Sequence, residues 1–168
     1  MKTAALCLKS LWILFLIHIS GCSFEATPEA PVWNSVATLK TIKAGAGTKL
    51  TQLNGGIEIS SQFSRLPKSS GVTGGAYFTV PSSIEKVLSG KRIKVSLLAL
   101  TPEQDGTIAL ALAYSTNRTG NSGWRRADTE LGIRQYAFYY DVPDDEMKGT
   151  RKDYIGILSD LYGVISPT

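Results

Sequence analysis

The chain has 168 residues, a formal net charge of +4, one histidine and two cysteines. A basic start followed by the nine-residue apolar run Leu11–Ile19 predicts that residues 1–21 are an export leader, because a membrane-spanning helix needs about 20 apolar residues. Its removal takes away two of the 18 basic residues, none of the 14 acidic ones, the histidine and one cysteine. The remaining chain cannot form a Ser–His or Cys–His nucleophile pair, a His-ligated zinc site or an intrachain disulfide. A net charge near +2 without a Lys/Arg run also argues against a nucleic-acid partner.

The end of the leader, Ile19-Ser20-Gly21-Cys22, resembles the bacterial lipobox. The resemblance implies that Cys22 is acylated after cleavage and becomes a lipid attachment point, so that the bilayer is a partner of the chain. Ser23, rather than aspartate, then implies transfer to the outer membrane, with the domain facing the periplasm. Residues 22–31 are predicted to be a lipidated tether. The alternative is an ordinary secretory leader in which Cys22 has no such role.

Residues 32–168 are predicted to form one β-rich domain, since short runs of period two alternate with Gly, Ser, Asn and Pro. A helix is predicted over Ser83–Leu88, with Ser82 to Glu85 as a capping box. The first half of the domain contains four expected strands: Ala37–Ile42, Lys49–Leu53, Gly56–Ser60 and Ala76–Val80.

The second half contains the stronger strand signals. Thr107–Tyr114 is apolar on both faces, which predicts a central strand. The other expected strands are Ile93–Leu100, Arg134–Val142, Tyr154–Leu158 and a last one over Tyr162–Ile165. The predicted fold class is therefore all-β, an antiparallel β-sandwich with one short helix.

The order of these features resembles bacterial jelly-roll domains of the galactose-binding-like type, a fold found in many carbohydrate-binding modules. The segments that carry the resemblance are 54–59 (NGGIEI), 77–81 (YFTVP), 89–96 (SGKRIKVS), 123–125 (GWR) and 136–143 (YAFYYDVP). Segments 114–117 and 120–124 are also similar to small uncharacterised exported proteins of alphaproteobacteria. The resemblance implies a jelly roll that binds carbohydrate.

The loop Ser115–Trp124 (STNRTGNSGW) is the strongest candidate ligand site. Asparagine and arginine side chains suit sugar hydroxyls, and an indole ring can stack on a pyranose face. Tyr139 is the next candidate. Tyr136, Phe138 and Tyr140 share the face of the expected strand that is predicted to lie in the core, so Tyr139 points to the opposite face. The predicted ligand-binding residues are Asn117, Arg118, Asn121, Trp124 and Tyr139. The alternative is a solvated loop in which Trp124 folds back onto the domain.

Acidic residues gather at Asp141, Asp144 and Asp145, and jelly rolls of this type often hold a structural calcium. Their spacing lacks the regular ligand pattern of a calcium loop, so they are weak metal candidates, and the spacing favours a solvated turn. Nothing positions two carboxylates across a cleft as a glycosidase requires. No catalytic residue, metal site or cofactor is therefore predicted.

Together these features predict a non-catalytic, membrane-anchored lipoprotein of the cell envelope that recognises an envelope or exported polysaccharide. The alternative is a structural or assembly lipoprotein that binds another envelope protein, because a shortened last strand leaves a sheet edge that accepts a strand from a partner.

Overall fold

Most of the chain is extended, as the alternating apolar residues predict. The computed structural model describes residues 12–13, 19–21, 33–35, 37–61, 74–101, 109–116, 119–144 and 152–159. The first sheet contains β1 (Trp12–Ile13), β2 (Ile19–Gly21), β4 (Thr48–Leu53), β5 (Gly56–Ser61), β7 (Arg92–Thr101) and β10 (Gly132–Asp141). The second contains β3 (Ile42–Ala44), β6 (Ala76–Thr79), β8 (Ala109–Ser115), β9 (Arg125–Asp128) and β11 (Tyr154–Leu158). One short helix, α1 (Ser82–Leu88), connects β6 to β7.

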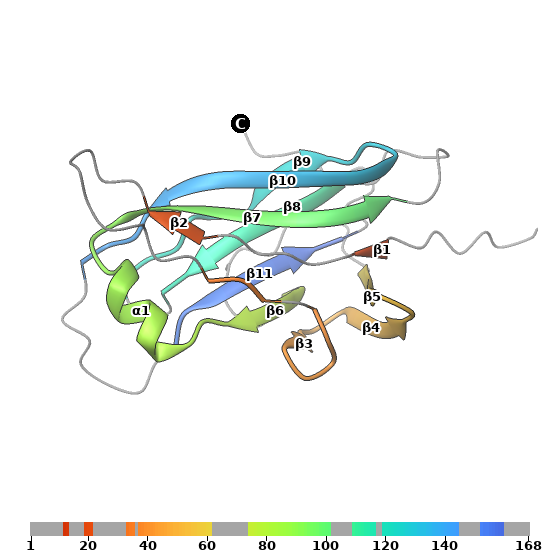
Figure 1. Ribbon diagram of the computed structural model, residues 1–168, viewed down its shortest axis with the longest axis horizontal. Coiled ribbons are helices and arrows are strands. Elements are labelled where there is room, and N and C mark those ends of the chain that lie inside the picture. Colours follow the sequence, from red (N-terminus) through yellow and green to blue (C-terminus); the bar gives the residue numbers. More distant parts are fainter. Residues whose placement is uncertain are drawn as a thin grey trace, which may run out of the picture.

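The strands form a two-layered antiparallel sandwich (Figure 1). In the first sheet the order is β10-β7-β1-β5-β4, with β2 also paired to β7, and in the second it is β3-β6-β11-β8-β9. All pairings between the described strands are antiparallel. The predicted all-β sandwich with one short helix is confirmed.

The core lies between the sheets and follows the period of two. On β7 the side chains of Ile93, Val95, Leu97 and Ala99 are buried against residues of the second sheet such as Phe78. Each large apolar side chain buried in this way stabilises the fold by about 1.5–3 kcal/mol. The strand β8 is buried on both faces and is flanked by β11 and β9, as expected for a central strand.

The expected strand over Ala37–Ile42 is wrong. A turn occupies Thr38 to Thr41, in which the Thr41 N–H donates to the Thr38 carbonyl oxygen (2.9 Å) and the Thr38 N–H donates to the Thr41 hydroxyl (2.9 Å). Threonine side chains that bond to nearby backbone in this way compete with a sheet ladder. The strand β3 therefore begins only at Ile42.

The helix α1 is confirmed, but its predicted capping box is wrong. The helix starts after Pro81, and no side chain caps it. Glu85 is buried, and its Oε1 accepts a hydrogen bond from the Asp153 backbone N–H (2.8 Å). The glutamate thus links the helix to the chain before β11 instead of capping its own first turn.

Two short strands lie within the predicted leader. The β1 residues pair with β5 and β7, and the β2 residues pair with β7 beside its N-terminal half (Figure 1). Cys22, the tether residues 23–31 and the expected strand Tyr162–Ile165 lie outside the described residues. Within the described part of the chain, no helix combines the length and apolar character that crossing a membrane requires.

Candidate functional site

The predicted loop site is only partly described, since Asn117 and Arg118 lie outside the described residues. Asn121 is exposed, and its Oδ1 accepts a hydrogen bond from the Gly123 N–H (2.9 Å), which closes a turn just before Trp124. The role of Asn121 in the described structure is therefore to shape the loop. Whether these residues contact a ligand stays a prediction.

Trp124 lies against the outer face of the second sheet. Its half-buried ring packs on a small apolar cluster of Ala109, Ala111 and Leu158. It also covers Gly156, where an added Cβ would come within 2.8 Å of the indole Cη2. Glycine at position 156 is what allows the ring to approach the strand so closely. The ring is thus held by the sheet.

Tyr139 belongs to a different surface. It lies on β10 in the first sheet, is 56% exposed, and has the Arg92 guanidinium 5.5 Å from its ring centroid. The neighbouring Phe138 and Tyr140 pack on the core, so Tyr139 faces outward. Because Trp124 covers the outer face of the other sheet, the structure does not bring these two candidates together.

The acidic candidates have separate partners. Asp141 lies 3.9 Å from the Arg92 Nε, and Asp144 accepts a hydrogen bond from the Ser89 hydroxyl (3.0 Å). Asp145 lies outside the described residues. Among the described residues, no three His, Cys, Asp or Glu side chains lie close enough together to hold a metal ion.

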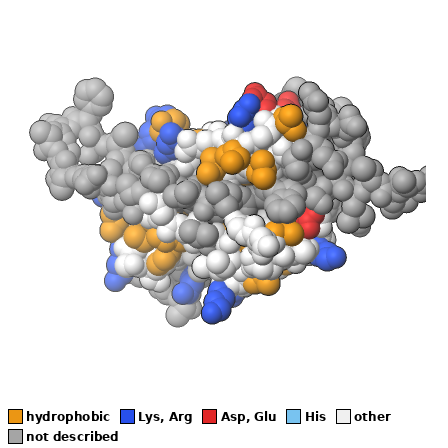
Figure 2. Space-filling model, turned by 45° about the vertical axis from the view of Figure 1, so that its right-hand side comes forward, with side chains coloured by type: hydrophobic (Ala, Val, Ile, Leu, Met, Phe, Trp, Pro, Cys, Tyr) orange, Lys and Arg blue, Asp and Glu red, His pale blue; other side chains and the backbone are white. Residues whose placement is uncertain are grey.

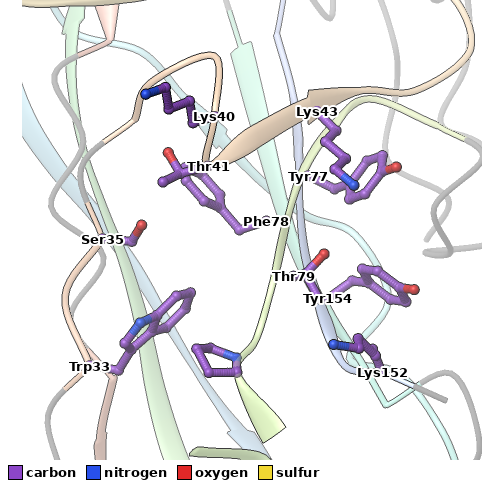
Figure 3. Close-up of a pocket in the computed structure, with 11 residues that line it drawn as sticks. Trp33, Ser35, Lys40, Thr41, Lys43, Tyr77, Phe78, Thr79, Lys152 and Tyr154 are labelled. Carbon is purple, nitrogen blue, oxygen red and sulfur yellow. The ribbon is translucent and has the colours of Figure 1, made fainter. Parts of the chain in front are cut away.

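A cavity of about 600 Å³ opens beside β3 and β6, a volume within the usual range for small-ligand sites (Figure 3). Trp33 and Ser35 lie on one side of it, and Thr79, Tyr154 and Lys152 lie on the other (Figure 3). The lining residues are Trp33, Ser35, Lys40, Thr41, Lys43, Tyr77, Phe78, Thr79, Pro81, Lys152 and Tyr154. We call this cavity the β3–β6 pocket.

The pleat of the second sheet brings two tyrosines of the pocket, Tyr77 and Tyr154, to its outer face. Phe78 and Ile155 face the core, so their neighbours Tyr77 and Tyr154 face outward. Their rings meet edge to face with centroids 5.6 Å apart. Lys43 is paired with Tyr77 across β3 and β6, and Lys152 precedes β11 by two residues. Lysines therefore flank the tyrosine pair above and below (Figure 3).

This arrangement suits a hydroxyl-rich, negatively charged ligand. The tyrosine and indole rings offer apolar surfaces for sugar faces, and Ser35 and Thr79 offer hydrogen-bonding hydroxyls. Three lysines supply positive charge, and none of the described lining residues is acidic. This pocket was not predicted from the sequence. The sequence does contain the two outward tyrosines on two expected strands, but nothing in it shows that these strands are neighbours.

A buried polar cluster lies behind the pocket. The Tyr114 hydroxyl donates to the Asp153 Oδ2 (2.6 Å), and the Asp153 N–H donates to the Glu85 carboxylate. Burial raises the pKa of Tyr114 far above its usual range, and the Asp153 carboxylate raises it further. The pKa of Tyr140, whose ring centroid lies 5.8 Å from that of Tyr114, is raised by the same two causes.

The buried polar cluster holds in place the part of the pocket wall that contains Lys152 and Tyr154. Asp153 stands between Lys152 and Tyr154, and its backbone carbonyl also accepts a hydrogen bond from the Val80 N–H (2.9 Å). The side chains of the cluster are almost fully buried, so their contribution is to fix α1, β8 and the start of β11 relative to one another.

On the face shown in Figure 2, hydrophobic side chains form several separate patches, and Lys and Arg side chains are dispersed rather than gathered in one stripe. In the β3–β6 pocket, by contrast, rings, hydroxyls and positive charges line one cavity. Comparison of the chain with protein-family models, with curated proteins and with solved structures finds no match.

Proposed function

We propose that this protein is a lipid-anchored, non-catalytic binding protein of the cell envelope that recognises an acidic polysaccharide. The observation that carries the proposal is the β3–β6 pocket, in which aromatic rings, hydroxyls and three lysines line one concave surface. The resemblance to galactose-binding-like jelly rolls supports the same conclusion at the level of fold alone.

The lysines define the ligand class. A neutral sugar needs rings and hydrogen-bond partners, but it gains little from three ammonium groups. A uronic acid or another acidic sugar places a carboxylate beside Lys43 or Lys152 while its ring lies against Tyr77 or Tyr154. Since these lysines are exposed, their attraction is screened by salt, and binding is expected to weaken as ionic strength rises.

A non-catalytic role fits the chemistry of the lining residues. None of those described carries a carboxylate, an imidazole or a thiol, the usual groups for acid–base or nucleophilic catalysis. The buried Glu85 and Asp153 lie behind the wall, where they bond to the chain itself.

Replacing Tyr154 by alanine is expected to weaken binding of alginate, an anionic polyuronate, about fivefold, because a lost ring contact costs on the order of 1 kcal/mol. Lys152→Gln should weaken it a few-fold and make binding less sensitive to salt. Affinity electrophoresis of the leader-processed protein in detergent measures both effects, with neutral dextran in a parallel gel. Lys49→Gln on β4, which removes the same charge from the other sheet, is the matched control and should bind like the wild type.

Trp124→Ala separates the two candidate sites. The β3–β6 pocket predicts that this variant retains binding while Tyr154→Ala loses it. The opposite result would move the site to the Trp124 loop. If the wild type binds neither alginate nor any other anionic glycan on an array, the proposed function is wrong.

Cys22→Ser is expected to release the protein from the membrane fraction, because the proposed anchor consists of acyl chains on this residue. Fractionation of cells that express the full chain, followed by immunoblotting, measures the distribution between membrane and soluble fractions. Ser23→Ala is the matched control and should stay in the membrane fraction. A Cys22→Ser protein that remains there in full contradicts the anchor.

A further inference from the structure

The edge of β6 is only partly covered by β3. The two strands pair as far as Ile42 opposite Phe78, and within the described part of the chain this register does not continue to Thr79. Instead the chain turns at Thr41, whose N–H donates to the Thr38 carbonyl oxygen (2.9 Å). The edge of β6 beside Thr79 is therefore left without β3 at the place where the β3–β6 pocket opens.

The backbone of Thr79 faces this uncovered edge. In an antiparallel ladder, successive residues direct their N–H and C=O groups alternately to the two neighbouring strands. Val80 donates its N–H to the Asp153 carbonyl oxygen (2.9 Å), on the β11 side. Gly75 accepts a hydrogen bond from the Gly45 N–H (2.7 Å), on the β3 side. Thr79 belongs to the same alternate set as Gly75, so its N–H and carbonyl oxygen point away from β11, toward the pocket that Thr79 lines.

The uncovered stretch is too short to bind another protein strand. The next residue of this set is Pro81, which has no N–H, and its carbonyl oxygen already accepts a hydrogen bond from the Ile84 N–H (2.8 Å) of α1. The residue of the set before Thr79 is Tyr77, which is paired with Lys43. A strand from a partner could thus bond to one residue of β6 only, whereas a small ligand needs no more than this one donor and one acceptor.

A donor and an acceptor on the same residue suit two neighbouring hydroxyl groups of a sugar ring. Since a hydroxyl both accepts and donates, one can accept from the Thr79 N–H while the next donates to the Thr79 carbonyl oxygen. Lys43 lies on the same side of β6, two positions along β3 from the place opposite Thr79, or about 7 Å. Its long side chain can therefore meet a carboxylate on the far side of the same ring.

We infer that the main chain of Thr79 recognises a vicinal diol. The ligand class is a uronate whose ring has two adjacent free hydroxyl groups and whose carboxylate meets Lys43. The inference rests on the proposed function, since it names the sugar that the β3–β6 pocket selects among acidic polysaccharides. A polymer with the same rings and charges but with blocked hydroxyls should bind poorly.

Alginate acetylated on its ring hydroxyls is the probe, because it keeps the rings and carboxylates but loses the hydroxyl donors. In affinity electrophoresis the leader-processed protein in detergent should bind it at least about fivefold more weakly than unmodified alginate. Thr79→Pro removes an N–H that faces the uncovered edge, where proline is tolerated. This variant should bind unmodified alginate about fivefold more weakly, and its preference for alginate over the acetylated polymer should fall to about twofold. Thr79→Ala, which loses the same side chain but keeps the N–H, is the matched control and should retain the wild-type preference.

Amide exchange measured by NMR gives a readout that needs no substitution, and it decides the question if Thr79→Pro does not fold. The Thr79 amide is expected to exchange rapidly in the free protein and at least about tenfold more slowly with saturating alginate, because the sugar then accepts its proton. The Phe78 amide, which faces β11, is the internal control and should exchange slowly in both samples.

A wild type that binds acetylated alginate as tightly as alginate overturns the inference, as does a Thr79→Pro variant that binds alginate like Thr79→Ala. So does a Thr79 amide that is already slow in the free protein, because part of the chain then occupies the edge. These results leave alginate binding by the wild type, and with it the proposed function, intact. If the wild type binds no anionic glycan, the proposed function and the inference fail together.

Discussion

Gly75→Ala is expected to lower the free energy of unfolding by about 3 kcal/mol or more, the largest single effect predicted for this fold. Gly75 has φ +73°, a conformation that costs a residue with a Cβ about 1–2 kcal/mol. An added Cβ would also collide with the Ile157 carbonyl oxygen and lie 2.7 Å from the Leu158 Cδ2. The neighbour is backbone of a central strand, so relief requires β6 and β11 to move apart.

The matched control is Gly55→Ala in the β4–β5 turn. Gly55 also has a positive φ, +95°, but nothing lies within 4 Å of its added Cβ. Only the conformational cost applies there, about 1 kcal/mol. Urea unfolding of the leader-processed protein measures both variants. Equal losses of stability would show that the close approach of Gly75 to Ile157 contributes nothing.

Gly75→Ala should also weaken alginate binding. Gly75 directly precedes β6, and Tyr77 and Tyr154 meet edge to face across the β6–β11 pair. Displacing one strand separates the rings that form the pocket wall. The close packing of Gly75 on β11 thus helps to set the geometry of the β3–β6 pocket.

The strands predicted most accurately from the sequence are those with one buried face, because burial requires apolar residues at every second position. On β7 and β11 one set of alternating side chains is in the core, and the predicted bounds agree with the structure to within one residue. The strand β9 (RRAD) has no such alternation, and no strand was expected over its four residues. It exists because Leu112 to Ala109 of β8 offer it a partner edge, which is a tertiary effect.

The candidate site was harder to predict because it depends on which strands are neighbours. Trp33 and Tyr154 line one pocket although more than a hundred residues separate them. Conversely, Trp124 and Tyr139 are close in sequence, but β9 and β10 belong to different sheets, so the two rings face away from each other. The packing of Trp124 on the second sheet did have a local signal in Gly156, since a glycine inside an apolar strand often marks the close approach of a large neighbour.

Tyr114→Phe is expected to lower the free energy of unfolding at neutral pH by about 1.5–3 kcal/mol. The substitution removes the hydroxyl that donates to the Asp153 Oδ2 at 2.6 Å, in a cluster where both residues are buried. A buried carboxylate that loses a donor is left less well compensated for its desolvation. The matched control is Tyr136→Phe, whose hydroxyl accepts a bond from the Glu130 N–H in an exposed turn, and the expected loss is below about 1 kcal/mol.

The effect of Tyr114→Phe should also depend on pH. In the unfolded chain a tyrosine loses its proton near pH 10, about its usual pKa. In the folded protein burial and the Asp153 carboxylate raise the pKa of Tyr114, so above pH 10 the folded state binds more protons than the unfolded state. The stability that Tyr114 contributes is therefore complete below pH 10 and falls as the pH rises further, by at most about 1.4 kcal/mol per unit.

Phenylalanine has no proton to lose, so the difference in unfolding free energy between wild type and Tyr114→Phe should narrow above pH 10. Tyr140, whose pKa is also raised, is present in both proteins and does not account for a change in the difference. Urea unfolding of both proteins at intervals from pH 8 to pH 11 measures it. A difference that stays constant across this range would mean that Tyr114 ionises as easily in the folded protein as in the unfolded chain, contrary to its burial beside Asp153.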